Sequence, residues 1–176
     1  MEKEKDKGIN KMTDLRFPWE EEMSQKTAEK LVPSERKDWD RFFMDIAKTI
    51  GKQSPCLIKH VGAILVRDRR ILAEGYNGPP AGIPHCKTCV RIDEDVKDYS
   101  KCPAIHAEIN CILLCAKHGL STQNATLYCE FFPCAYCTGA LINAGIKEIV
   151  YEKPAVDNLA MPLALASGIK VRRLEG

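Results

Sequence analysis

Apolar residues recur at regular spacing from about residue 34 onward, first with a helical period and then in runs typical of strands. Ser34 can cap the first helix. Segments 57–66 and 71–77 are rich in apolar and β-branched residues and flank a polar turn at 68–70, which predicts a two-stranded hairpin. The first helix should bury one apolar stripe, formed by Trp39, Phe42, Phe43, Ile46, Ala47 and Ile50.

Helices and strands alternate after a long loop over residues 78–104. The pattern places helices at about 105–118, 134–144 and 157–167, and strands at 125–132, 147–152 and 169–174. Pro162 should strain the last helix. This order predicts an α/β fold, a three-layer α/β/α domain around a central mixed five-stranded sheet whose later strands run parallel.

Residues 1–33 are charged and lack a periodic apolar pattern, so we expect a flexible N-terminal arm followed by one domain over 34–176. No apolar run approaches the roughly 20 residues that span a bilayer. The first residues lack the apolar core of a secretory signal, and we expect a cytoplasmic protein without a membrane partner. The formal net charge of +2 argues against a nucleic-acid partner.

Nine cysteines are many for a chain of this length, and their odd number argues against a closed set of intrachain disulfides. Clustered cysteines in a reducing compartment more often bind metal or take part in catalysis. Three of them, Cys111, Cys115 and Cys129, fall inside a predicted helix and strand and should be small core residues. His60 and His118 are expected to be surface or packing residues.

Two motifs form a candidate catalytic metal centre: His106-Ala107-Glu108, and Pro133-Cys134-Ala135-Tyr136-Cys137. Each lies where a predicted helix begins. Zinc takes four nitrogen and sulfur ligands, and a catalytic site leaves one position for water. His106, Cys134 and Cys137 supply three, and the combination H-x-E with P-C-x-x-C is a signature of zinc deaminases.

The same motifs predict the chemistry. Bound zinc lowers the pKa of water to about 7, and Glu108 would carry protons from that water to the ring nitrogen and the leaving amine. A structural zinc site beside an incidental acid is the alternative, but it would need a fourth protein ligand. A thioredoxin-like redox motif would leave His106 and Glu108 unexplained.

Four further cysteines surround the long loop and could form a second, structural zinc site, with His85 as an alternative ligand for any one of them. Loose buried or surface thiols are the other interpretation, and metal analysis distinguishes the two. The four are Cys56, Cys86, Cys89 and Cys102.

Four stretches carry a resemblance to a known family: CLIKHVGAILV, GYNGPPAGIPHC, CPAIHAEINCI and ATLYCEFFPCAYCTGALINAGIKEIVYE. They resemble the zinc-dependent cytidine and deoxycytidylate deaminases, and within these the deoxycytidylate (dCMP) deaminases, over roughly residues 38–152. The resemblance implies a cytidine-deaminase-like fold and hydrolytic deamination of dCMP to dUMP and ammonia. The GYNG-x-P-x-G loop separates this group from tRNA adenosine deaminases.

The resemblance also implies that Asn77 contacts the sugar or base of the nucleotide. It implies a homo-oligomer, frequently a hexamer, with dCTP and dTTP as effectors in some members. Relatives with a second zinc have ligands that resemble the four loop cysteines. Two departures stand out: Cys111 replaces a usual alanine, and residues 153–157 lack an aromatic that many relatives carry near the phosphate, which leaves monophosphate recognition open.

Two other functions stay open beside dCMP deamination. One is deamination of another nucleoside, a nucleotide or tRNA adenosine, against which the near-neutral charge and the GYNG-x-P loop both argue. The other is a zinc-stapled binding protein without turnover. Glu108 argues against it, because binding alone does not need that acid.

Overall fold

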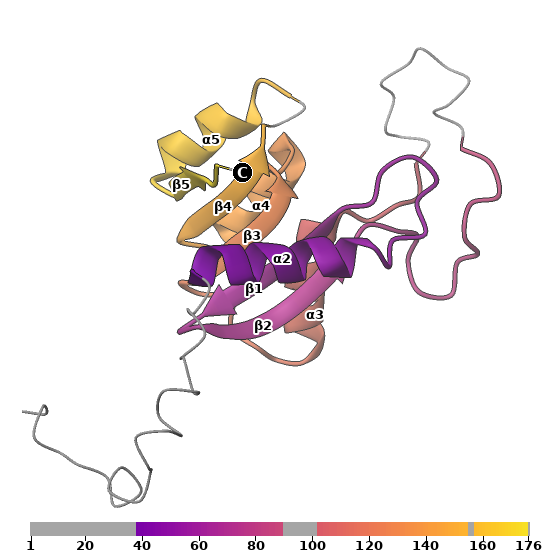
Figure 1. Cartoon of the computed structure of the whole chain (residues 1–176), viewed down its shortest axis with the longest axis horizontal. Helices are drawn as coiled ribbons and strands as arrows, with labels where there is room; N and C mark the ends of the chain where they lie inside the picture. The colour runs from indigo at the N-terminus through magenta and orange to yellow at the C-terminus, as the bar shows by residue number, and fades with distance from the viewer. Residues whose placement is uncertain (1–37, 90–101, 155–156, 176) are drawn as a thin grey trace, which may run out of the picture. The chain divides into compact units, whose positions relative to one another are not determined.

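The computed structural model describes residues 38–89, 102–154 and 157–175. Within them, helices and strands follow the predicted order (Figure 1). The first described helix, α2 (Trp39–Gly51), begins after Asp38. The predicted cap Ser34 and the predicted arm over 1–33 lie outside the described residues. None of the helices in this part of the chain is long and apolar enough to cross a membrane.

One mixed sheet contains the five strands, in the order β2-β1-β3-β4-β5. Strand β1 runs antiparallel to both of its neighbours, whereas β3, β4 and β5 run parallel, as predicted from the alternation of strands and helices. The strands are β1 (Gly62–Arg67), β2 (Arg70–Tyr76), β3 (Thr126–Phe131), β4 (Glu148–Lys153) and β5 (Lys170–Arg173).

The predicted hairpin is present, but its first strand begins at Gly62 and not at residue 57. The side chain of Asn77 explains the difference. Its Oδ1 accepts from the Val61 backbone N–H at 2.8 Å, and its Nδ2 donates to the Lys59 carbonyl at 2.9 Å. Because a side chain takes these backbone groups, they are not available to a neighbouring strand. Residues 57–61 are therefore a loop despite their apolar composition.

Helix α2 covers one face of the sheet, where its buried residues pack against alternate strand residues. Phe43 and Ala47 of the predicted stripe are buried. Trp39 and Phe42 are 38% and 42% exposed, whereas Met44, which the prediction omitted, is fully buried in this cluster. The strand residues of this cluster are Ile64, Val66, Tyr128 and Val150.

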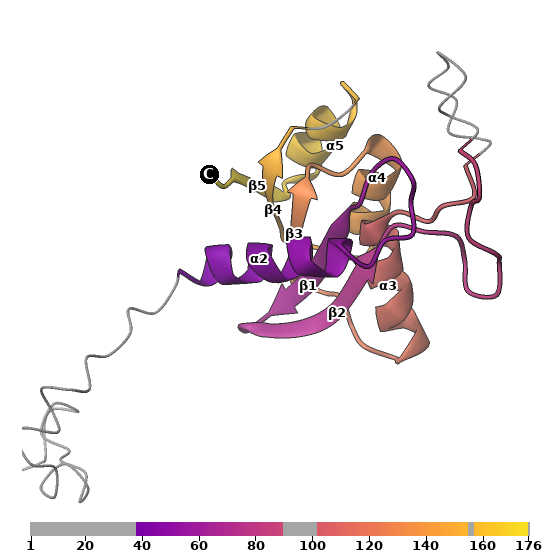
Figure 2. The same ribbon diagram turned by 45° about the vertical axis from the view of Figure 1, so that its right-hand side comes forward.

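Three helices cover the opposite face: α3 (Ala107–Lys117), α4 (Ala135–Asn143) and α5 (Ala160–Ser167). Figures 1 and 2 show α2 and α3 on opposite sides of the sheet, which gives the predicted three layers. Helix α5 starts later than predicted, so Pro162 lies in its first turn, where its missing N–H interrupts no intrahelical hydrogen bond. The expected strain at Pro162 is therefore wrong.

Candidate zinc site

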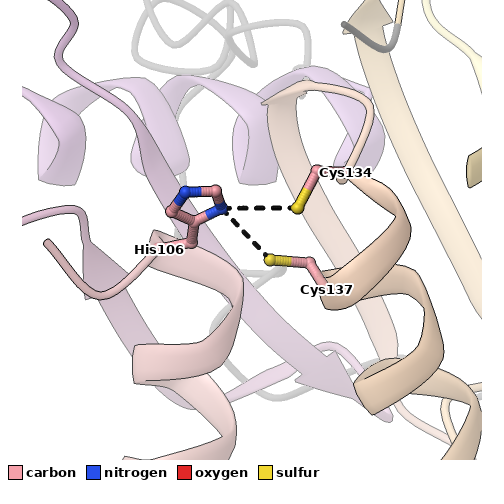
Figure 3. Close-up of side chains that lie close together, drawn as sticks. All are labelled: His106, Cys134 and Cys137. Atoms are coloured by element: carbon pink, nitrogen blue, oxygen red, sulfur yellow. Dashed lines mark hydrogen bonds between the residues drawn. The ribbon is translucent and has the colours of Figure 1, made fainter. Parts of the chain in front are cut away.

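His106, Cys134 and Cys137 converge from the beginnings of α3 and α4 (Figure 3). Nδ1 of His106 lies 3.5 Å from Sγ of Cys134 and 3.4 Å from Sγ of Cys137. All three ligand atoms lie within 4.8 Å of one another. Elsewhere in residues 38–89, 102–154 and 157–175, no three His, Cys, Asp or Glu side chains bring ligand atoms this close.

The donor set of this group fits zinc. One imidazole nitrogen and two sulfurs are ligands that zinc prefers, and three protein ligands leave a fourth position open, as in a catalytic site. His106 and Cys134 have extended backbone and immediately precede their helices, which lets both side chains reach beyond the helix ends. The predicted placement of both motifs at helix starts is confirmed.

The two thiols differ in their protonation. Hydrogen bonds from Cys137, and then from His106, lower the pKa of Cys134 to about 4 despite its burial. The pKa of Cys137 is raised, first by its hydrogen bond to Cys134 and then by burial. The positive end of α4 further favours a thiolate. A thiolate, the form that binds a metal, is thus favoured at Cys134 before any ion arrives.

Glu108 is buried beside the cysteines. It is 5% exposed, and its Oε2 lies 3.8 Å from Sγ of Cys137. Burial raises the pKa of this carboxyl group and outweighs the attraction of His106. A raised pKa lets a carboxyl group hold and release a proton at higher pH than an exposed carboxyl does, which suits a proton carrier.

A close contact between β2 and α3 fixes the start of α3. A side chain at Gly75 would lie 2.9 Å from the backbone nitrogen of Cys111 and would also meet the carbonyl of Ala107. Asn110 adds a hydrogen bond from Nδ2 to the Tyr76 carbonyl at 2.7 Å. Only glycine fits at this position, and the resulting contact holds α3, with His106 and Glu108 at its first turn, against the sheet.

Asp157 is a contributor that the sequence analysis missed. Its Oδ2 accepts from the Ala135 N–H at 2.9 Å, and its Oδ1 accepts from Leu159 and Ala160 at 3.0 Å and 2.8 Å. Burial works to raise the pKa of this carboxyl, but the three backbone donors outweigh it and lower the pKa. Asp157 thus joins the beginning of α5 to the residue that follows Cys134.

Asn77 and its neighbours connect the loops beside the site. In addition to its contacts with residues 59–61, Asn77 accepts a hydrogen bond at its carbonyl from Ser54 Oγ at 2.7 Å. Gly78 and Ile105 exchange two backbone hydrogen bonds of 3.1 Å and 2.8 Å, and Ile105 directly precedes His106. The observed contacts of Asn77 are therefore with the protein backbone, and its predicted substrate contact stays a prediction.

The second set of cysteines shares one location. Cys56, Cys86, Cys89 and Cys102 all line a small cavity of about 30 Å³, together with Pro55 and Gly78. Each of the four is half-buried and free of disulfide bonds. Within the described residues they do not form a group of three ligand atoms as close as that at His106. His85 is exposed and does not line the cavity.

The remaining cysteines and histidines lie where the sequence predicted. Cys111, Cys115 and Cys129 are fully buried in the core between the sheet and helices α3 to α5. His60 is exposed and contacts the Cys56 carbonyl at 2.9 Å, and His118 is exposed at the end of α3.

Comparison with known proteins identifies the family of this chain. Residues 37–153 match the family described as the cytidine and deoxycytidylate deaminase zinc-binding region. Deoxycytidylate deaminase of Mycobacterium phage D29 is 41% identical over 126 residues, 67% of this chain and 97% of that protein. ComE operon protein 2 of Bacillus subtilis is 38% identical, covering 80% of this chain and 74% of that protein. The chain spans about half the length of the Saccharomyces cerevisiae deoxycytidylate deaminase that it matches, 47%.

A solved structure gives the same result. The dCMP deaminase of cyanophage S-TIM5, in complex with dCMP and dUMP, superposes with a TM-score of 0.70 at 25% identity, over 80% of this chain and 100% of that chain. The match in fold and the His-Cys-Cys geometry agree with the sequence match. The chain belongs to the cytidine and deoxycytidylate deaminase family.

Proposed function

We propose that this chain deaminates dCMP hydrolytically to dUMP and ammonia, with one zinc ion held by His106, Cys134 and Cys137. The observation that carries the proposal is the buried carboxylate of Glu108 beside a three-ligand site with one open position. The deoxycytidylate deaminases among its relatives support the choice of substrate.

The zinc ligands and Glu108 have different roles in the proposed reaction. A zinc ion bound here would lower the pKa of a coordinated water to about 7 and so supply a nucleophile at neutral pH. Glu108 would accept one proton from the attacking water and deliver it to the ring nitrogen of cytosine. It would then take the remaining proton of the hydroxyl added to the ring and deliver it to the amine, which leaves as ammonia while the carbonyl of the uracil ring forms. Burial excludes bulk water from Glu108, which strengthens its interaction with the charge that develops on the ring.

Asn77 directly follows β2, and we propose that it is the substrate contact of the loop that begins there. An asparagine amide has two N–H donors, and one of them is used by the Lys59 carbonyl. The second would donate to the sugar or the base. Because the same side chain holds residues 59–61, Asn77→Ala should weaken both the loop and substrate binding, and a rise in KM larger than the fall in kcat is the expected signature.

One assay separates the candidate functions. The purified, zinc-loaded chain is offered dCMP, dCTP, cytidine and a tRNA anticodon stem, and ammonia release is recorded for each. Preferential turnover of dCMP supports the proposal, and preference for another compound redirects it. Turnover of none of them would favour a zinc-stapled binding protein.

A second, structural zinc ion is the finer proposal for the cysteines at the small cavity. What supports it is that four thiols, the number in an all-cysteine site, line one cavity. Metal analysis should give two zinc ions per chain, falling to one in the double variant Cys86→Ser/Cys89→Ser. One zinc ion in the unchanged chain would contradict it. Cys115→Ser, in the core, is the control.

The remaining proposals concern the cellular location, the assembly and the effectors of the enzyme. We propose a cytoplasmic homo-oligomer, with a hexamer as the expected form and dCTP and dTTP as candidate effectors. Exposed apolar side chains on α3, α4 and α5 support association: Leu113, Tyr136 and Leu165 are 52%, 92% and 63% exposed. Light scattering in solution with and without dCTP tests the assembly, and a monomer under both conditions would contradict it.

A further inference from the structure

A buried serine joins the end of α2 to the loop that follows β2. Ser54 is 6% exposed, and its Oγ donates to the Asn77 carbonyl at 2.7 Å. The same oxygen accepts from the Cys56 backbone N–H at 3.2 Å. A hydroxyl group has a single proton to donate, and Ser54 donates it to a residue 23 positions away in the sequence. The bond is therefore a tertiary contact, which holds Asn77 against the end of α2.

The residue after Ser54 adds a packing contact to the same loop. A Cβ atom at Gly78 would lie 3.1 Å from both Cγ and Cδ of Pro55, so the proline ring lies directly against the Gly78 backbone. Ser54 and Pro55 thus contact Asn77 and Gly78, two consecutive residues. Gly78 in turn exchanges two backbone hydrogen bonds with Ile105, and the zinc-site histidine follows Ile105 directly. Residues 54–55 therefore support Asn77 and the segment that leads into the zinc site.

Asn77 is held at two separate places, and Ser54 provides the second of them. The Asn77 backbone N–H donates to the Val61 carbonyl at 3.1 Å, and both ends of its side-chain amide bind residues 59–61. These three contacts fix Asn77 to that loop alone. The bond from Ser54 adds a fixed point at the end of α2, a helix that packs on the sheet. Two supports give the Asn77 amide a defined direction before a ligand arrives.

We propose that Ser54 is a positioning residue for substrate binding: its hydroxyl holds the Asn77 carbonyl and so sets the direction of the Asn77 amide. This inference rests on the proposed function, in which that amide donates to the sugar or the base of the nucleotide. Ser54 acts through Asn77 and does not touch the substrate. Because an amide that is already in place binds without a further ordering cost, loss of the hydroxyl should raise KM more than it lowers kcat.

The first test removes the hydroxyl and measures KM and kcat separately. In the zinc-loaded Ser54→Ala protein, KM for dCMP should rise by about 3–10-fold, the range expected when one hydrogen bond is lost, with kcat changed by less than about 2-fold. Thr122→Val is the matched control. It breaks a hydroxyl-to-carbonyl bond of 2.6 Å that spans 22 residues, from Thr122 to Ala144 at the far end of α4. Its KM should equal that of the unchanged chain, and circular dichroism checks that each variant is folded at the assay temperature.

A double-variant cycle separates positioning from a general loss of stability. If Ser54 acts through the Asn77 side chain, Ser54→Ala should raise KM in the unchanged chain but add little to the KM of Asn77→Ala. An effect of Ser54 on the fold alone would multiply KM by the same factor in both backgrounds, because the two changes would then be independent.

The outcomes distinguish this inference from the proposed function. A rise in KM that disappears in the Asn77→Ala background supports the inference. An unchanged KM in Ser54→Ala, or the same factor in both backgrounds, would overturn it and leave Ser54 with a structural role alone, while turnover of dCMP by the unchanged chain still supports the proposed function. Failure of the unchanged chain to deaminate dCMP would instead overturn the proposed function, and this inference with it.

Discussion

Oε2 of Glu108 lies 3.8 Å from Sγ of Cys137, so the buried acid and a metal-binding thiol approach each other from two different helices. Glu108 belongs to the first turn of α3 and Cys137 to the first turn of α4. Both helices start at the same edge of the sheet, and the positive ends of both therefore favour anionic groups here. In the proposed function, this relationship would place the proton carrier beside the zinc ion without making it a ligand.

Removing one ligand should remove the catalytic metal. Cys134→Ala leaves two of three protein ligands, so we expect the zinc content to fall by about one ion per chain and deamination to be lost. Metal analysis after dialysis measures the first effect and ammonia release the second. Cys129→Ala, which changes a buried thiol of the core, should keep its zinc. A Cys134→Ala protein with full zinc content would show that the metal is held elsewhere.

Asp157→Asn should affect the zinc site at a distance. One amide oxygen can still cap α5, but the amide cannot also accept from the Ala135 N–H, because its other end is a donor. Loss of a contact that supports a metal ligand typically lowers metal affinity or activity by about 10–100-fold. For Asp157→Asn we expect zinc affinity and kcat to fall by an amount at the lower end of this range. The midpoint of thermal unfolding should fall by only about 2–4 °C.

Zinc affinity and the midpoint of thermal unfolding are measured together. They show whether Asp157 positions the zinc site or only stabilises the fold. Asn158→Ala, the exposed neighbour, is the control. An Asp157→Asn protein with unchanged zinc affinity and unchanged kcat, whatever its thermal midpoint, would contradict the positioning role.

The contact of Asp40 on α2 with the sheet should make the folded protein less stable as the pH becomes acidic. The Arg172 side chain, and then the Tyr128 hydroxyl, donate hydrogen bonds to Asp40 and hold the pKa of that carboxyl below its usual 3.8. A carboxyl whose pKa is lowered on folding stabilises the folded state above its unfolded pKa, and this stabilisation is lost as the pH falls through the folded pKa.

We therefore expect Asp40→Asn to unfold at a lower temperature than the unchanged chain near pH 7. The difference should shrink as the pH falls below about 4, first because the unfolded carboxyl becomes protonated and then because the native carboxyl does so at its lower pKa. Thermal unfolding followed by circular dichroism from pH 7 to pH 3 measures it. Asp38→Asn is the matched control, because the Asp38 side chain makes no capping hydrogen bond to α2. A difference that stays constant over this range would contradict the role of the ionised carboxyl.

The fold and the grouping of His106, Cys134 and Cys137 could be predicted because local signals encode them. Alternating periodicities placed the elements, and H-x-E and P-C-x-x-C are short motifs whose position at helix starts follows from the same pattern. The segment 57–61 was predicted as strand because its composition is apolar, but the Asn77 side chain, distant in sequence, binds its backbone instead. Tertiary contacts of this kind carry no local signal.

Asp157 illustrates the same limit at the site. It follows Ala135 by 22 residues, and its contact with α4 exists only because α5 packs beside that helix. The side chain of Asp157 could be read from the sequence, but its partner could not.

The central claim is that Glu108 carries protons in a zinc-dependent deamination of dCMP. The most direct measurement follows dUMP and ammonia formation from dCMP by the zinc-loaded chain and by Glu108→Gln, with Glu74→Gln as an exposed control. The account predicts equal zinc content in all three, full turnover in the control, and a fall in kcat of about 10²–10⁴-fold or more in Glu108→Gln. Retained turnover in Glu108→Gln at equal zinc content would contradict it.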